Sequence, residues 1–159
     1  MNDEYIPAEY VVIAQDLRAD MAKKLSKRHK MRVIGISGGL ADCVNVLGLR
    51  FEMTGPVTKE RLREILVNCV EEFLAAINAN ERLRPFLKNF PFTSKEIEII
   101  IFVSDKKGYE IFDPDIGVAS AVNGKISYNT TDRANPYGYK GDFIENYEEA
   151  LEFVKNSRK

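Results

Sequence analysis

An Asn-Gly pair at positions 123 and 124 separates two runs of strand-forming residues, at 116–122 and 125–130. Asn and Gly both tolerate the positive φ angles of a two-residue turn, and this pair between two such runs is the strongest short-range hairpin signal that a sequence offers. A two-residue turn joins only antiparallel strands. The pair therefore predicts a β-hairpin within an antiparallel sheet.

Hydrophobic periodicity predicts the other elements. Apolar residues at helical spacing indicate one helix at residues 8–27, a second that follows the N-cap residue Thr58 and ends near residue 80, and a third that starts at Asp142 with Glu145 in a capping box. Alternating or β-branched runs indicate strands at 32–37, 44–54 and 97–103, whereas 131–141 is a predicted loop.

The predicted order is α-β-β-α-β-β-β-α, which is an α+β fold with a mainly antiparallel five-stranded sheet covered by helices. This order resembles the layout of profilin-like and roadblock-type domains. The resemblance concerns element order alone and brings no functional residue with it; it implies a dimerisation or binding module. A chain of 159 residues suits one domain, at 8–157, after a loose N-terminal segment at 1–7.

Composition narrows the function classes. The net charge is −1, and the chain has one histidine, His29, and two cysteines, Cys43 and Cys69. These counts argue against a disulfide framework, a metal site and a Ser-His-Asp arrangement, so we expect no metal and no cofactor. The acidic first residues and the absence of a membrane-length apolar stretch indicate a cytoplasmic protein.

A glycine-containing segment after the first predicted strand is the first candidate site. Ser37, Gly38, Gly39 and Asp42 resemble the Ser-Gly-Gly-x-Asp-Ser motif of the ATP-pyrophosphatase (PP-loop) family, which implies binding of the ATP pyrophosphate. Here Asp42 comes one position late, and Cys43 follows it in place of a serine. The motif also requires a helix after the loop. The alternative is a plain connection between antiparallel strands.

A basic run is the second candidate, as an anion-binding patch formed by Lys23, Lys24, Lys27, Arg28, Lys30 and Arg32. The alternative is a solvated helix end whose cations match the helix dipole. The run contains no aromatic residue for base stacking, which argues against nucleic acid. Since the predicted last helix is acidic, the two helices could also meet between two copies of the chain.

The third candidate is a binding loop that carries Tyr128, Tyr137 and Tyr139 among glycines and polar residues. The alternative is an ordinary connection whose tyrosines cover the hairpin. An acidic group at Asp105, Glu110, Asp113 and Asp115 lacks calcium-loop spacing and suits turns better than a cation site.

Three hypotheses about the function remain. The leading hypothesis is a non-enzymatic protein-binding or dimerisation module that associates with itself or with a protein partner. Whether the chain is an enzyme stays open, although the candidate residues argue against catalysis. The first alternative is a nucleotide-binding enzyme that uses the Ser37–Asp42 segment. The second is a binder of small apolar ligands in a cavity lined by Phe73, Phe86, Phe90 and Phe92.

Overall fold

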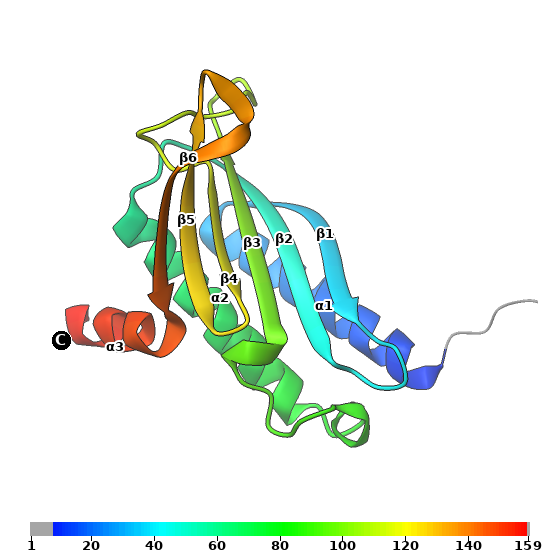
Figure 1. The fold of residues 1–159 in the computed structure, drawn as a ribbon. Coiled ribbons are helices and arrows are strands. Elements are labelled where there is room, and N and C mark those ends of the chain that lie inside the picture. Colours follow the sequence, from blue (N-terminus) through cyan, green and yellow to red (C-terminus); the bar gives the residue numbers. More distant parts are fainter. Residues whose placement is uncertain (1–7, 159) are drawn as a thin grey trace, which may run out of the picture.

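The computed structural model describes residues 8–158, so the segment predicted to be loose, 1–7, lies outside the described part. The described residues form an α+β fold with a single sheet (Figure 1). Its helices and strands are α1 (Glu9–His29), β1 (Arg32–Gly39), β2 (Val46–Thr54), α2 (Lys59–Ala79), β3 (Ile97–Ser104), β4 (Val118–Val122), β5 (Lys125–Asp132), β6 (Asn135–Asn146) and α3 (Tyr147–Ser157). None of these helices is long and apolar enough to cross a membrane.

The sheet has six strands, which lie side by side in the order of the chain. All neighbours are antiparallel except β2 and β3, which are parallel. The α+β class is therefore confirmed, and most strand pairs are antiparallel as expected, but the sheet has six strands instead of five and is mixed because one pair is parallel.

The parallel pair follows from the helix between its strands. Strand β2 ends before Gly55-Pro56, and Thr58 then starts α2 by accepting the N–H of Arg61 at 3.1 Å. The helix α2 carries the chain back along the sheet, so that the next strand enters in the same direction as β2. A crossover helix of this kind permits parallel strands, whereas the two-residue turn at Asn123 and Gly124, with φ of 52° and 77°, forces β4 and β5 to be antiparallel.

The helices α1 and α2 cover only one face of the sheet, the rear face in Figure 1. Side chains on this face are buried, and cross-strand partners share it: Leu49 pairs with Ile99, and Ile99 with Ala121. The apolar stripe of α2 packs on them with Leu62, Ile65, Leu66, Cys69, Phe73 and Ile77, all fully buried. The opposite face has no helix over it, so β2 to β5 each have one dry side and one open side, whereas no residue of the edge strand β1 is buried.

Strand β6 is the main correction to the sequence analysis. Residues 135–146 form this strand, where a loop and the first turn of a helix were expected. The helix α3 starts later, at Tyr147, because the side chain of Asn146 accepts the N–H groups of Glu148 and Glu149. The N-cap is therefore Asn146 and not Asp142.

The reason for the longer strand lies in Glu145, which was expected to cap a helix. Its carboxylate instead accepts two hydrogen bonds from the guanidinium of Arg63 on α2, at 2.7 and 2.8 Å, in a nearly buried pair. The bond to Glu145 raises the pKa of Arg63 and keeps its charge. Removal of either partner would leave a buried charge alone, so this contact holds β6 in the extended form and ties it to α2.

The division into a covered and an open face predicts a difference between two neighbouring isoleucines of β3. Replacement Ile99→Ala should lower the free energy of unfolding by about 2–5 kcal/mol, because Ile99 is fully buried under α2. Replacement Ile100→Ala on the open face should cost about 1 kcal/mol or less. Urea unfolding of both variants measures the difference, and equal losses would show that the open face is covered in solution.

Candidate functional site

The open face of the sheet has an apolar centre, formed by Ile100 and Phe102 on β3 and by Val118 and Val122 on β4. These four side chains are half-buried although no helix covers them. Each lies one residue away from a core position, because successive side chains of a strand point to opposite faces. An uncovered apolar group at the middle of a sheet is a feature of binding surfaces.

Charged side chains border the apolar centre on the β2 side. Arg50 lies beside Ile100, and Glu52 lies beside Phe102, each as a cross-strand partner in the parallel pair. Glu52 also accepts a hydrogen bond from Arg32 on β1 at 2.9 Å. The surface therefore combines a dry middle with a polar border, as protein interfaces do.

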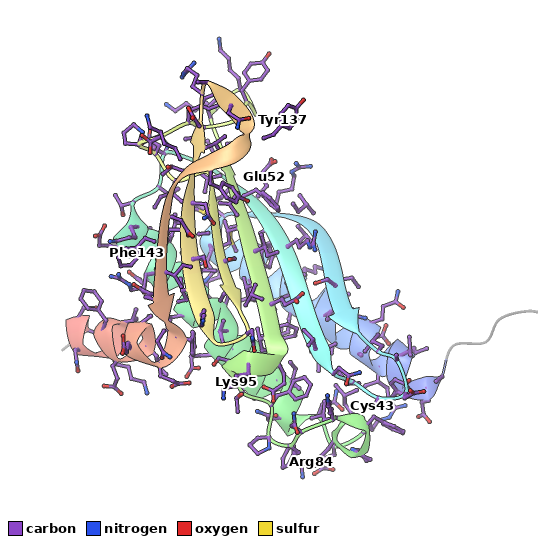
Figure 2. The ribbon with its side chains drawn as sticks, in the orientation of Figure 1. Cys43, Glu52, Arg84, Lys95, Tyr137 and Phe143 are labelled. Atoms are coloured by element: carbon purple, nitrogen blue, oxygen red, sulfur yellow. The ribbon has the colours of Figure 1, made fainter. Side chains whose placement is uncertain are left out.

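A hollow of about 440 Å³ opens at the end of the apolar centre, between the open face and the hairpin of β5 and β6. Figure 2 shows Tyr137 on this hairpin and Glu52 on the sheet below it. The hollow is lined in part by Glu52, Phe102, Glu110, Thr131, Tyr137 and Tyr139. The lining contains the carboxylates of Glu52 and Glu110, and since Glu52 already pairs with Arg32, the hollow suits a positively charged group mainly through Glu110 and the two tyrosine rings.

The hairpin keeps its place over the open face through contacts with residues 112 and 113. The register of β5 and β6 shifts at Thr130 and Thr131, and such irregularities bend a strand. The hydroxyl of Thr130 donates to Asp113 at 2.6 Å and accepts the N–H of Gly141 at 2.8 Å. The guanidinium of Arg133 also lies 4.6 Å from the ring centre of Phe112. The outer wall of the hollow is therefore held by specific contacts.

The three tyrosines of the predicted binding loop separate in the structure. Tyr137 and Tyr139 line the hollow and are exposed. Tyr128 is buried on the covered face, where its hydroxyl donates to Glu145 at 3.3 Å and burial raises the pKa of the phenol. Tyr128 thus belongs to the core, while the other two stay candidates for binding.

The segment that resembles a phosphate loop lies at the turn between β1 and β2. Gly38 and Gly39 end β1, and the next regular element is strand β2, where the PP-loop motif requires a helix. A Cβ atom on Gly38 would lie 2.7 Å from the carbonyl oxygen of Val46, so glycine is needed here for close approach of two strands. Phosphate binding by this segment stays a prediction, without the helix N-terminus that would support it.

Ser37 has a structural contact of its own on the open face. Its hydroxyl donates to Glu98 on β3 at 3.4 Å, across the intervening strand β2. Ser37 can reach Glu98 because residue 48, on the strand between them, is glycine. A Cβ atom at this position would lie 2.1 Å from the Ser37 oxygen. Asp42 lies apart from this contact, exposed in the turn with a φ of 65°.

The residues of the basic run lie on the second half of α1 and at the start of β1. Arg28 forms an ion pair with Glu72 of α2, and Arg32 pairs with Glu52. Lys23, Lys24, Lys27 and Lys30 are exposed. The acidic helix α3 packs on α2 and next to β5 and β6, whereas α1 packs next to β1 and β2. The helices α1 and α3 therefore lie near opposite edges of the sheet (Figure 1).

The two cysteines and the histidine are far from a catalytic arrangement. Cys43 donates to the side chain of Asn45 at 3.6 Å, while the His29 ring bonds Asn68 on α2 at 2.7 Å. Cys69 is fully buried in α2, and burial raises the pKa of its thiol to about 12. Within residues 8–158, no three His, Cys, Asp or Glu side chains are grouped so that they could hold a metal ion.

The remaining candidates have local roles. Asp105 accepts the N–H groups of Lys107 and Tyr109 and so shapes its own turn. Of the phenylalanines expected around an apolar cavity, Phe73 and Phe92 are buried in the core, and Phe90 is 52% exposed beside the guanidinium of Arg84.

Sequence reasoning missed two residues that form the binding surface of the open face, Glu52 and Phe102, whereas Glu110 was considered only as part of an acidic group. The alternation along β3 places Ile100 and Phe102 on one side of the strand, which was a readable signal. It does not show which side the helices leave uncovered. That information comes from the strand order and from the packing of α1 and α2.

Comparison with known proteins gives no relative: no family model, no curated protein and no solved structure matches this chain.

The burial of Cys69 predicts that only one thiol of the native protein is reactive. At pH 8 a thiol reagent such as DTNB should label Cys43 rapidly, because Cys43 is partly exposed, and should label Cys69 only after unfolding, because its thiolate is strongly disfavoured. Absorbance of the released thiolate gives the count. The variant Cys43→Ser should lose the fast phase, and a fast phase that survives in it would contradict the buried position of Cys69.

Proposed function

We propose that this chain is a non-enzymatic protein-binding module, and that it uses the open face of the sheet to hold a partner segment with apolar and basic side chains. The observation that carries the proposal is the uncovered apolar centre beside an acidic hollow. The occupant is a protein segment of defined chemistry: an apolar side chain rests on Ile100, Phe102 and Val118, and a lysine or arginine enters the hollow.

The apolar centre supplies the area for such a contact. Phe102 and Val118 are cross-strand partners and also line the hollow, so the apolar surface continues into it. Aromatic side chains carry much of the energy of protein interfaces when they become buried at the centre. A partner side chain on this pair would cover the part of their surface that water still reaches.

The charges of the hollow select the partner. Glu52 and Glu110 offer carboxylates, and Tyr137 and Tyr139 offer aromatic rings, which together attract an ammonium or guanidinium group. Arg50 lies beside the apolar centre two residues from Glu52 on the same face of β2, and it would favour an acidic side chain of the partner. The open face thus has opposite charges at two places, the acidic hollow and Arg50, and these charges set the register of a bound segment.

The described residues support binding more than chemistry. Ser37 and Cys43, the hydroxyl and thiol weighed in the sequence, contact Glu98 and Asn45 and have no histidine beside them. Glu52 and Glu110 border the hollow, and Glu52 already pairs with Arg32.

Selection from a phage-displayed library of random twelve-residue peptides tests the proposal. We expect enriched peptides to combine lysine or arginine with a neighbouring apolar residue. The double variant Glu52→Gln/Glu110→Gln should weaken the binding of a selected synthetic peptide at least tenfold, as measured by fluorescence anisotropy, because it removes both carboxylates of the hollow. NMR shift changes should centre on β3, β4 and the hairpin of β5 and β6.

The matched control is Glu148→Gln/Glu152→Gln on α3, which changes the net charge equally but lies away from the hollow. This control should bind the peptide as the unmodified chain does. Selection of acidic peptides, or equal binding by both double variants, would refute the proposed site.

A further inference from the structure

A second hollow, of about 360 Å³, lies at the end of the sheet opposite the hollow at Tyr137. Three segments meet around it: residues 93–95 before β3, the turn 123–125 between β4 and β5, and residues 146–148 at the start of α3. Figure 2 shows Lys95 at this end of the sheet and Tyr137 at the other. We call this second hollow the turn pocket; it shares no lining residue with the first.

Backbone hydrogen bonds hold the three segments of the turn pocket together. The N–H of Gly124 donates to the carbonyl oxygen of Ser94 at 3.1 Å, and the N–H of Tyr147 donates to the carbonyl oxygen of Gly124 at 2.9 Å. Gly124 has a φ of 77°, which favours glycine at this turn. The walls of the turn pocket are therefore fixed relative to one another before a ligand binds, which lowers the entropy cost of binding.

The hydroxyl group of Ser94 is the observation that points to a ligand. Ser94 is 8% exposed and lines the turn pocket, and its hydroxyl has no hydrogen-bond partner among residues 8–158. The hydroxyl of the neighbouring Thr93, by contrast, donates to Glu96 at 2.7 Å and accepts the N–H of Lys95 at 3.3 Å. Because a buried polar group without a partner costs free energy, we expect the partner of Ser94 to come from outside the chain.

The other polar groups of the turn pocket are mainly donors. Lys95 and Lys125 supply two exposed ammonium groups, and neither has an ion-pair partner within the described part of the chain. Asn146 uses its Oδ1 atom to accept the N–H groups of Glu148 and Glu149, at 2.8 and 3.4 Å. Only the NH₂ group of Asn146 is then left for a ligand, and an amide NH₂ is a donor.

The charge of the turn pocket is positive. One carboxylate, that of Glu148, lines it together with the two ammonium groups. The nearby carboxylate of Glu96 does not line it, because Glu96 accepts hydrogen bonds from Thr93 and from Asn89, at 2.7 and 3.3 Å. Excess positive charge and several donors together favour an anion with more than one oxygen atom.

We propose that the turn pocket is a binding site for a phosphate group. Phosphate carries a charge of about −1.5 to −2 at pH 7 and has several strong acceptor oxygens. These match the two ammonium groups, the hydroxyl of Ser94 and the amide of Asn146. The volume of about 360 Å³ lies near the lower end of ligand pockets, so a phosphate attached to a small organic molecule also fits.

An NMR titration of the ¹⁵N-labelled protein with inorganic phosphate and with glycerol 3-phosphate tests the site. We expect shift changes centred on residues 93–95, 123–125 and 146–148, with a dissociation constant below about 1 mM for at least one of the two probes. Tighter binding of glycerol 3-phosphate identifies a phosphate ester as the ligand, whereas equal binding identifies the free anion.

The replacement Ser94→Ala tests the hydroxyl. Since this hydroxyl has no partner in the described chain, its removal should leave the midpoint of urea unfolding in phosphate-free buffer unchanged. It should weaken phosphate binding at least fivefold, because a hydrogen bond to a charged group is lost. A hydroxyl with a purely structural role would give the reverse, a lower midpoint with unchanged binding.

Two single charge changes in the turn pocket should act in opposite directions. At constant ionic strength, Lys125→Gln should weaken phosphate binding at least fivefold, and Glu148→Gln should strengthen it. The matched control is Lys27→Gln on α1, which removes the same charge as Lys125→Gln but lies outside the turn pocket. This control should leave the dissociation constant unchanged.

Four results would overturn the proposal: no binding of either probe, shift changes centred on the basic run at residues 23–32, unchanged binding by Ser94→Ala, or equal weakening by Lys125→Gln and Lys27→Gln. The last result would show an adventitious attraction of phosphate to surface lysines only. The outcome is independent of the peptide-binding proposal, because Glu52 and Glu110 line the other hollow.

Discussion

Packing of α2 on the buried faces of β3 and β4, beside α1 on β1 and β2, is the constraint on which the other elements depend. The apolar stripe of α2 needs a dry surface, and the buried residues of β3 and β4 supply that surface. Since α2 also brings the chain back along the sheet, the strands before and after it, β2 and β3, are parallel and adjacent. The other strands can then be added only outward, β1 on one side and β4 to β6 on the other, which gives the sequential order of the sheet.

This constraint explains how much of the fold was readable from the sequence. The turn at Asn123 and Gly124, the cap at Thr58 and the buried strand β3 are encoded locally, and all three are found where the sequence predicts them. The parallel pairing of β2 and β3 is not local, because it depends on the side on which α2 packs. A helix between two strands was nevertheless a signal for a parallel crossover, and the hairpin signals outweighed it.

Strand β6 shows why the remaining part could not be predicted. Asp142 and Glu145 have the spacing of a capping box, and local rules therefore favour a helix there. The structure uses Glu145 to neutralise Arg63, which is 82 residues away in sequence, and leaving this nearly buried guanidinium without its partner would cost more than the loss of a helix cap of about 1 kcal/mol. The candidate site likewise divides into residues with a local signal and residues without one. Tyr137 and Tyr139 were recognisable from the composition of their segment, whereas Glu52 and Phe102 became candidates only through the strand register and through the packing of the helices on one face of the sheet.

The buried guanidinium of Arg18 fixes the position of α1 at the edge of the sheet. Burial lowers the pKa of this arginine, which donates hydrogen bonds to two backbone carbonyl groups, and its burial costs free energy of desolvation. In return it fixes α1 under β1 at one height, without covering the apolar side chains of the edge. Because Arg18 holds α1 on the covered side of the sheet, the open face has no helix over it and stays available to a partner.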